Sequence, residues 1–362
     1  MKNNNYCIIM AGGVGSRFWP MSTPQKPKQF LDVLGIGKSL IQMTYDRLLL
    51  TAPKENIYIL TNTNYASIVK EQLPDLTFDQ ILTEPKRKNT APCIAYAAAK
   101  IMAKNADATL IISPSDHLIV RENRFTEIIS VAINRANEED RLVTLGIQPT
   151  RPDTGYGYIE FSKANEIKAS EVTNVIQFRE KPDLETAIEF VESGNFYWNS
   201  GIFVWKAKTI LDALLNFQPA LHNLFAGNLS AYNTENEQEY VNNCFELCED
   251  ISIDFAVMEN AKNTDVVLAD FDWSDLGTWG SLNSHLTKDE NNNSIVGKNA
   301  YLFNSTNCLV NIPQDKLVLL DGLNDYIIVE SENMLMILKS ENEQELKKYL
   351  KHIENKSPEF FQ

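Results

Sequence analysis

Hydrophobic and polar positions along the first 150 residues predict short buried strands separated by amphipathic helices. Short apolar runs indicate strands, whereas longer segments with apolar residues three and four positions apart indicate helices. The expected strands are residues 6–10, 56–61, 81–83, 109–113 and 142–147. The expected helices are residues 39–50, 65–73, 91–103 and 125–137. This alternation predicts an α/β fold with a mostly parallel sheet, whose ligand site lies beyond the carboxyl ends of the strands.

The pattern changes after about residue 150. The expected strands are now residues 156–161, 172–178 and 201–205, and the expected helical stretches are residues 184–193 and 210–259. A polar run at residues 289–294 is typical of a linker. It is followed by short β-type runs over residues 295–339 and a closing helix over residues 342–352.

These elements predict two domains. We expect a large domain over residues 1–288 and a small β-rich domain with a closing helix over residues 295–362. The chain has 362 residues, of which 44% are hydrophobic and 22% charged, so a sizeable core is available.

The charge balance narrows the choice of partners. The formal net charge is −15, which disfavours a nucleic-acid or anionic-membrane binder because such proteins carry broadly basic surfaces. A small anionic ligand stays compatible, since it needs only a local basic cluster. We therefore expect no nucleic-acid partner and no membrane partner.

Cysteine usage and hydropathy predict the compartment. The five cysteines are too few and too scattered for a disulfide framework. No apolar stretch reaches the roughly 18 residues of a membrane span. The first apolar run is too short for the core of a signal peptide. We therefore expect a cytoplasmic protein.

A glycine-rich loop, residues 12–17, directly follows the first expected strand. Glycines let the backbone approach phosphate groups and present its N–H groups to them, although a plain turn from strand to helix has a similar sequence. The loop lacks the dinucleotide-binding pattern, because Phe18 stands where a third glycine or an alanine is needed. Three nearby cations, Arg17, Lys26 and Lys28, favour a phosphate site.

A second basic segment, residues 84–92, precedes the alanine-rich helix. Asn89 or Thr90 is a suitable N-cap for that helix, and capping is the simpler explanation, most strongly for Thr90. Three consecutive cations at residues 86–88 oppose the helix dipole, and a bound anion would relieve this conflict.

Two acidic segments are candidates for a metal site. Asp116 follows the buried strand at residues 109–113, and Asp275 lies in a segment with two tryptophans. Mg²⁺ is commonly bound by one or two protein carboxylates together with substrate phosphate oxygens. A cap or a turn is the alternative role for Asp116, and the spacing alone leaves Asp275 ambiguous.

Two further segments are typical of a sugar site. Residues 154–158 place glycines between aromatic residues, and Glu180, Lys181 and Asn199 offer a carboxylate, an ammonium and an amide. A surface ion pair is the alternative interpretation of Glu180 and Lys181.

In this order, these motifs over residues 6–285 resemble the sugar 1-phosphate nucleotidylyltransferases, and most closely the mannose-1-phosphate guanylyltransferase family. The resemblance implies a Rossmann-like, mostly parallel mixed sheet with a small C-terminal β appendage. It assigns catalysis to Arg17, Lys28, Asp116 and Asp275, and metal binding to the two aspartates. It assigns nucleotide binding to Ala11, Gly12, Gly13, Gly15, Ser16, Glu84, Asn89, Thr90 and Ser115. It assigns sugar-phosphate binding to Gly157, Glu180, Lys181 and Asn199.

The implied reaction transfers GMP from GTP to mannose 1-phosphate, forming GDP-mannose and pyrophosphate with Mg²⁺ or Mn²⁺. A homodimer is expected by analogy, with the β appendage used for packing or dimerisation. Two alternatives stay open: another hexose or heptose 1-phosphate as substrate, or a non-catalytic regulatory homologue that binds sugar nucleotides. A dinucleotide-dependent dehydrogenase is disfavoured by the missing third glycine.

Overall fold

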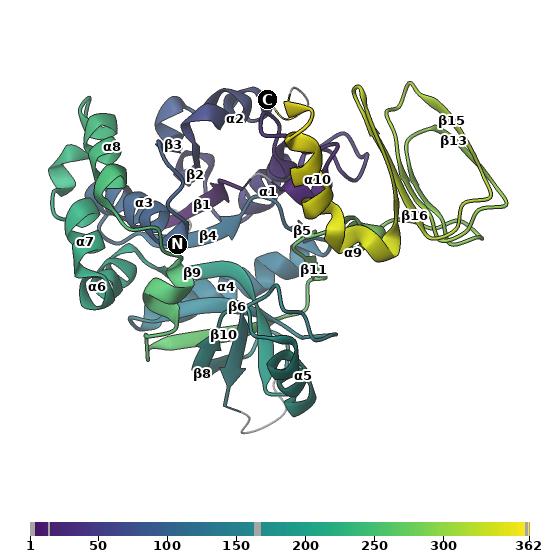
Figure 1. Cartoon of the computed structure of the whole chain (residues 1–362). Helices are drawn as coiled ribbons and strands as arrows, with labels where there is room; N and C mark the ends of the chain where they lie inside the picture. The colour runs from purple at the N-terminus through teal and green to yellow at the C-terminus, as the bar shows by residue number, and fades with distance from the viewer. Residues whose placement is uncertain (1–3, 14, 163–167, 359–360, 362) are drawn as a thin grey trace. The chain divides into compact units, whose positions relative to one another are not determined.

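The computed structural model describes residues 4–13, 15–162, 168–358 and 361, and its internal contacts divide the chain into two compact units (Figure 1). The first unit comprises Met1–Gly12, Thr44–Ser115 and Ile119–Trp273. The second comprises Gly13–Met43, Asp116–Leu118 and Ser274–Gln362. Both units therefore combine segments that are far apart in the sequence.

A nine-stranded sheet forms the centre of the first unit, in the order β3-β2-β1-β4-β9-β6-β10-β8-β7. Its strands are β1 (Asn5–Ala11), β2 (Ile57–Asn62), β3 (Ile81–Glu84), β4 (Thr109–Pro114), β6 (Leu142–Ile147), β7 (Tyr158–Phe161), β8 (Val172–Arg179), β9 (Phe196–Lys206) and β10 (Thr264–Ala269). The pairs β3–β2, β2–β1, β1–β4 and β6–β10 are parallel, whereas β9 is antiparallel to β4, β6 and β7. The predicted α/β class with a mixed sheet is confirmed.

Helices cover this sheet and complete the core of the first unit. They are α2 (Ala66–Gln72), α3 (Thr90–Lys104), α4 (Glu122–Glu138), α5 (Leu184–Ser193), α6 (Ala207–Phe217), α7 (Pro219–Ala226) and α8 (Glu237–Leu247). Helix α4 packs on β6, β9 and β10, whereas α3 packs on α6 and α7. The buried alanines of α3 allow this close packing, and they also favour the helical state.

The register of the parallel strands positions the loops that matter for function. Ala11 pairs with Thr61, Asn62 with Glu84, and Met10 with Pro114. The strands β1, β3 and β4 therefore end at the same edge of the sheet, where Gly12, Pro85 and Ser115 follow. The predicted location of the glycine loop at the carboxyl ends of the strands agrees with this register.

The C-terminal part of the second unit consists of short strands that belong to two sheets. Strands β12 (Ser294–Val296), β14 (Leu309–Asn311), β16 (Tyr326–Ser331) and β17 (Met334–Lys339) form one sheet, and β13 (Asn299–Phe303) pairs in parallel with β15 (Leu317–Asp321). From β12 to β16, successive strands alternate between the two sheets. The predicted β-rich C-terminal appendage is thereby observed. A 3₁₀ turn, Ser340–Glu345, leads into the closing helix α10 (Leu346–Glu354).

The core of the second unit joins this C-terminal segment to the glycine loop. Leu346 and Leu350 of α10 share one buried cluster with Phe18 and Trp279, and the rings of Phe18 and Trp279 lie 4.7 Å apart. Trp279 begins the short helix α9 (Trp279–Asn283). The C-terminal helix is thus part of the hydrophobic core beneath the loop.

Candidate active site

The loop after β1 is shaped by Gly15, which has a φ of 60°. A Cβ atom at Gly15 would lie 2.2 Å from Cβ of Lys28, so both the backbone angle and the space require glycine. Ser22 Oγ donates a hydrogen bond to the Gly15 carbonyl at 2.6 Å, and Gln29 Nε2 donates one to the Gly13 carbonyl at 2.9 Å. These contacts hold the loop against the aliphatic part of the Lys28 side chain.

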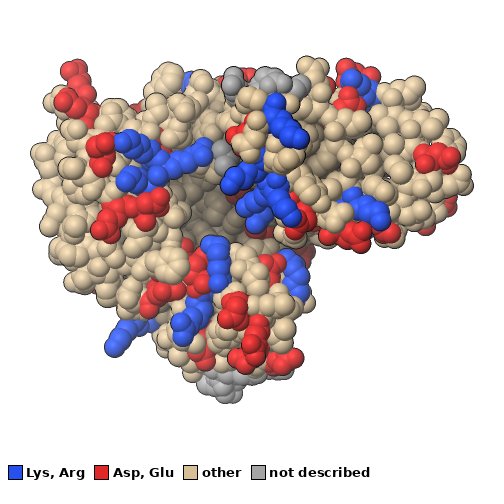
Figure 2. Space-filling view, in the orientation of Figure 1, with Lys and Arg blue, Asp and Glu red and all other residues tan. Residues whose placement is uncertain are grey.

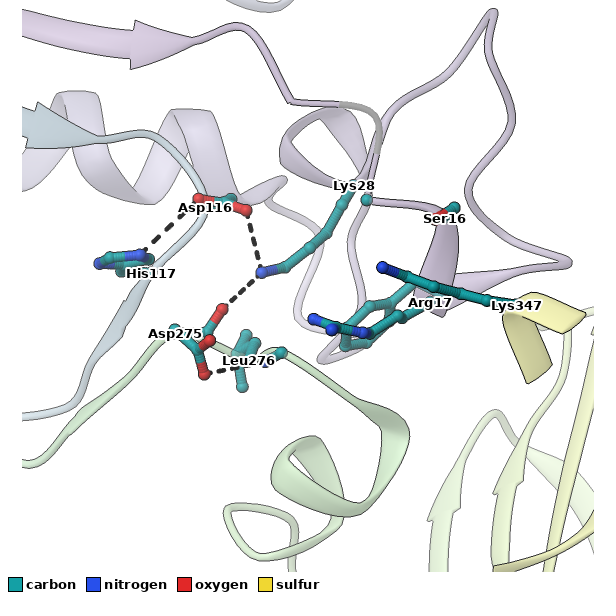
Figure 3. Close-up of a pocket in the computed structure, with 11 residues that line it drawn as sticks. Ser16, Arg17, Lys28, Asp116, His117, Asp275, Leu276 and Lys347 are labelled. Carbon is teal, nitrogen blue, oxygen red and sulfur yellow. Dashed lines mark hydrogen bonds and ion pairs between the residues drawn. The ribbon is translucent and has the colours of Figure 1, made fainter. Parts of the chain in front are cut away.

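Lys28 connects the two aspartates that the sequence singled out. The residue lies in the 3₁₀ turn Lys28–Phe30 and is buried. Its Nζ donates to Asp116 Oδ2 at 3.0 Å and to the main-chain oxygen of Asp275 at 2.6 Å (Figure 3). Because one nitrogen bonds to both residues, Asp116 and Asp275 are direct neighbours although they are far apart in the sequence.

These residues line a cavity of about 330 Å³ within the second unit. Ser16 and Arg17 project into it from the turn Ser16–Phe18, and Lys347 projects into it from α10 (Figure 3). The four predicted catalytic residues, Arg17, Lys28, Asp116 and Asp275, therefore lie on one cavity. Gly15 and Ser16, two of the predicted nucleotide-binding residues, belong to its wall.

The electrostatic environment keeps Asp116 ionised. Burial raises the pKa of the carboxyl, but the positive charges of Lys28 and His117 and the hydrogen bond from Lys28 outweigh burial and hold the pKa below its ordinary value. His117 contributes from 4.0 Å, measured from Nε2 to Asp116 Oδ1. At neutral pH the cavity therefore contains a carboxylate beside two basic side chains.

The donor set at this end of the cavity fits a hard divalent cation. Asp116 and Asp275 supply carboxylate oxygens, and one or two carboxylates suffice for Mg²⁺ or Mn²⁺ when substrate phosphates complete the coordination. Among the described residues no group of three or more His, Cys, Asp or Glu side chains could hold a metal ion. Two carboxylates leave most of the coordination shell to other ligands, such as the phosphate oxygens of a substrate.

Another group of predicted nucleotide-binding residues lies in the first unit. A Cβ atom at Gly12 would lie 3.3 Å from Glu84 Oε1, so Gly12, which follows Ala11, lies beside the end of β3. Glu84 is buried and accepts a hydrogen bond from the Cys93 thiol at 3.0 Å. Burial raises its pKa. The Ser115 amide donates to the Met10 carbonyl at 3.0 Å, which holds Ser115 beside β1.

Asn89 and Thr90 have separate structural roles. Asn89 is the N-cap of α3, with a φ of 66°, and its Oδ1 accepts from the Thr90 amide at 3.0 Å. Thr90 Oγ1 accepts from the amide of Ile253 at 2.8 Å. Capping by Asn89, one of the two options left by the sequence, is the one observed.

The three cations at residues 86–88, beside which a bound anion stays a prediction, each contact another part of the protein. Lys86 Nζ lies 2.5 Å from Glu246 Oε2, Arg87 Nη2 donates to Tyr65 Oη at 2.9 Å, and Lys88 Nζ donates to the Cys248 carbonyl at 3.0 Å. The protein itself supplies a partner for each of the three cations. The sequence pattern did not reveal these partners, because they lie on distant elements such as α8, which carries Glu246.

The structure brings the four predicted sugar-phosphate residues together in the first unit. The Asn199 amide donates to the Gly157 carbonyl at 2.8 Å. A Cβ atom at Gly157 would lie 2.5 Å from Glu180 Oε2, so the Gly157 backbone lies directly beside this carboxylate. Lys181 Nζ donates to Glu180 Oε1. A carboxylate, an ammonium and an amide thus converge, as a site for hydroxyl and phosphate groups needs.

Asp254 belongs to the same group, and no signal in the sequence pointed to it. Its Oδ1 accepts a hydrogen bond from Asn199 Nδ2 at 3.0 Å, and it begins a π-helical turn, Asp254–Met258. Burial and the charge of Glu180 raise its pKa to about 6. The residue lies in a stretch expected only to be mostly helical. Single π-turns are frequent at functional sites.

Charge is distributed in small mixed groups on the face displayed in Figure 2, where basic side chains lie beside acidic ones. In the part of the chain that the structure describes, no helix has the length and apolar character needed to cross a bilayer.

Known proteins of similar sequence match most of this chain. A family model described as nucleotidyl transferase matches residues 6–292. A mannose-1-phosphate guanylyltransferase from Klebsiella pneumoniae is 38% identical over 346 residues, which cover 94% of this chain and 72% of that protein. The alginate biosynthesis protein AlgA of Pseudomonas aeruginosa is 37% identical over 352 residues, covering 96% of this chain and 72% of that one.

A solved structure extends the comparison to the fold. The crystal structure of a protein from Thermus thermophilus, described as a mannose-1-phosphate geranyltransferase, aligns with a TM-score of 0.86 at 26% identity. The alignment covers 97% of this chain and 99% of that one, so it includes most of the C-terminal strands.

Proposed function

Because the chain belongs to the nucleotidyl transferase family, we propose that it transfers GMP from GTP to mannose 1-phosphate, forming GDP-mannose and releasing pyrophosphate. The observation that carries the proposal is the convergence of Arg17, Lys28, Asp116 and Asp275 on one cavity. The choice of GTP and mannose 1-phosphate is supported by relatives at 37–38% identity that are named mannose-1-phosphate guanylyltransferases.

The reaction needs no general base. The second pKa of a phosphate monoester is about 6, so the attacking phosphate oxygen is already largely ionised at neutral pH. This oxygen attacks the α-phosphorus of GTP, and the bond between that phosphorus and the oxygen bridging to the β-phosphorus breaks. Pyrophosphate leaves with the bond electrons. The protein has to align the two phosphates and neutralise their charge.

The cavity in the second unit provides the positive charge that neutralises the reacting phosphates. Asp116 and Asp275 would hold Mg²⁺ or Mn²⁺, which supplies positive charge to the reacting phosphates when bound; members of the family generally depend on a divalent metal. Arg17 and Lys28 stabilise the triphosphate and the departing pyrophosphate. The short contacts of Lys28 to Asp116 and Asp275 keep its ammonium group fixed beside the metal ligands.

The remaining residues bind the two substrates. We assign nucleotide binding to residues of the glycine-rich loop, of the ends of β1, β3 and β4 and of the start of α3: Ala11, Gly12, Gly13, Gly15, Ser16, Glu84, Asn89, Thr90 and Ser115. We assign mannose 1-phosphate to Gly157, Glu180, Lys181 and Asn199. Lys181 binds its phosphate, while Glu180 and Asn199 orient its hydroxyl groups.

The proposal also covers the context of the enzyme. We place it in the cytoplasm, with residues 1–288 as the catalytic domain and residues 295–362 as a small domain that supports a homodimer. Strands β13 and β15 expose a row of large apolar side chains that would serve this contact.

The test is product identification. The purified chain is incubated with GTP, mannose 1-phosphate and Mg²⁺, and GDP-mannose and pyrophosphate are quantified by chromatography. Parallel reactions replace GTP by ATP, CTP, UTP or dTTP, and mannose 1-phosphate by glucose, fucose or heptose 1-phosphate. We expect the highest kcat/KM for GTP with mannose 1-phosphate. Absence of pyrophosphate release with every pair would disprove the transferase function.

A further inference from the structure

Helix α10 delivers a lysine to the cavity that holds Asp116 and Asp275. Lys347 is exposed and lines this cavity together with Ser16 and Arg17. In Figure 3 its side chain extends from α10 toward the same space that Arg17 faces. The cavity therefore contains a cation from the C-terminal segment, far from Lys28 in the sequence.

Two anchors fix the helix that carries Lys347. Leu346 and Leu350 are buried in the cluster that contains Phe18 and Trp279, so α10 packs directly on the core beneath Arg17. One turn before Lys347, Glu343 Oε1 accepts a hydrogen bond from the Gly280 amide at 2.7 Å. This bond ties the start of the closing segment to α9, which follows Asp275 by a few residues. Lys347 is thus positioned by rigid elements.

Two neighbouring lysines, Lys348 on the same helix and Lys28 in the same cavity, differ from Lys347 in their partners. Among the residues that the structure describes, the Lys347 side chain forms no ion pair or hydrogen bond, whereas Lys348 Nζ lies 3.0 Å from Glu345 Oε2. Lys28 is committed to Asp116 and Asp275 at the other end of the cavity. Lys347 and Arg17 therefore form a positive end of the cavity.

We propose that Lys347 binds the β- and γ-phosphates of the nucleoside triphosphate and the pyrophosphate that leaves. This proposal rests on the proposed nucleotidyl transfer and deepens it, because it makes the C-terminal helix a part of the phosphate site. Lys28 lies between the two aspartates, where the α-phosphate reacts. Arg17 and Lys347 face the rest of the cavity, where the polyphosphate end lies.

The experiment compares full-length Lys347→Ala, Lys347→Arg and Lys348→Ala with the parent protein. Lys348→Ala is the matched control, because it removes the same charge from the next position of the same helix, outside the cavity. The dissociation constant of inorganic pyrophosphate with Mg²⁺ is measured by calorimetry. The KM values of pyrophosphate and GDP-mannose are measured in the reverse reaction. Thermal melting checks that each variant is folded.

Loss of one charge-assisted phosphate contact should weaken pyrophosphate about tenfold in Lys347→Ala, in both its dissociation constant and its KM. The KM of GDP-mannose should stay within about twofold, since that substrate lacks the β- and γ-phosphates of GTP. Lys347→Arg should recover most of the loss, and Lys348→Ala should behave as the parent.

A folded Lys347→Ala protein whose pyrophosphate affinity changes less than about twofold, or no more than in Lys348→Ala, overturns the proposal. The binding measurement separates this failure from failure of the proposed function. A parent protein without turnover on any substrate pair disproves nucleotidyl transfer, whereas the calorimetric comparison still decides whether Lys347 binds the polyphosphate.

Discussion

Asp275 contributes to the cavity through two separate groups. Its main-chain oxygen accepts a hydrogen bond from Lys28 Nζ at 2.6 Å, and its carboxylate Oδ1 accepts one from the Gly277 amide at 3.0 Å. A change of the side chain alone therefore leaves Lys28 bonded to the backbone. This separation allows the negative charge of Asp275 to be tested apart from the position of Lys28.

Asp275→Asn should reduce kcat by a factor of about 10² or more while the melting temperature stays close to that of the parent. Asparagine keeps an oxygen for the Gly277 amide but removes the charge that binds a divalent cation. The measurement is kcat as a function of Mg²⁺ concentration, with circular dichroism as the check on folding. Near-normal turnover at saturating Mg²⁺ would exclude Asp275 as a metal ligand.

Asp254 is a residue whose charge opposes folding at neutral pH. Burial and the nearby Glu180 raise the pKa of its carboxyl from 3.8 to about 6. Below about pH 4 the group is protonated in the folded and the unfolded chain, so the shift has no effect on stability. Between about pH 4 and 6 the unfolded chain loses its proton first, and stability falls as pH rises. Above about pH 6 the full cost is present.

Asp254→Asn should therefore stabilise the protein at pH 7.5 by an amount on the order of 1–3 kcal/mol and leave stability near pH 4 unchanged. Asparagine still accepts the hydrogen bond from Asn199. Thermal melting at both pH values measures the difference. In the same variant the KM of mannose 1-phosphate should rise about tenfold, because a carboxylate binds a hydroxyl more strongly than an amide does. Equal melting temperatures at pH 7.5 would contradict the assigned pKa shift.

At the scale of elements, the loop between β1 and the turn Ser16–Phe18 positions Lys28 through glycine. Gly15 and Gly37 both have positive φ values, 60° and 84°, so alanine is strained at either position. They differ in their surroundings: a Cβ atom at Gly37 meets no atom within 4 Å, whereas one at Gly15 meets Lys28 Cβ at 2.2 Å. Alanine variants at these two positions therefore separate the effect of backbone strain from the effect of displacing Lys28.

Gly37→Ala should cost about 1 kcal/mol of stability and leave kcat within about twofold of the parent. Gly15→Ala should cost more and lower kcat at least about tenfold, because Lys28 has to move away from Asp116 and Asp275. Chemical denaturation and steady-state kinetics on both variants provide the comparison. Equal kcat values in the two variants would show that Lys28 does not depend on Gly15.

The sequence predicted elements well where local chemistry determines them. The expected helix at residues 91–103 is observed as Thr90–Lys104, because alanines favour it and Asn89 caps it. The strand expected at residues 201–205 instead extends over Phe196–Lys206. It lies between β4 and β6 in the sheet, and these neighbours supply the hydrogen bonds that lengthen it. Its length thus comes from tertiary pairing that the local pattern does not contain.

In the candidate site, too, the residues found from the sequence lie in local motifs, whereas those that were missed depend on tertiary packing. Arg17, Lys28, Asp116 and Asp275 could be selected because they lie in short motifs with unusual charge or glycine content. Lys347 and Asp254 lie in segments whose pattern indicates only a helix, and packing alone brings them to their neighbours. The partners of residues 86–88 were missed for the same reason, since Glu246 and Cys248 lie far away along the chain.

At the scale of the whole molecule, the outer row of β13 and β15 is a surface suited to a second copy of the chain. Tyr301 pairs with Leu319, and Leu317 and Phe303 lie on the same row; all four side chains are at least half exposed. The alternating residues Ala300, Leu302, Val318 and Leu320 pack inward. A contiguous apolar row of this kind is typical of a protein contact. It supports the proposed homodimer.

Replacing Leu317 and Leu319 together by glutamate should convert the proposed dimer to a monomer. Each glutamate would place a charge in an apolar contact, and the same two charges would repel across a two-fold axis. Light scattering after size-exclusion chromatography measures the mass; the parent should have twice the mass of the variant. Leu247→Glu is the control, because Leu247 on α8 is 72% exposed, close to the 74% and 68% of Leu317 and Leu319. A monomeric parent would exclude the dimer, and a variant that stays dimeric would place the contact elsewhere.

If activity survives in the monomer, the catalytic cavity is complete within one chain, as the location of Arg17, Lys28 and Lys347 in a single unit leads us to expect.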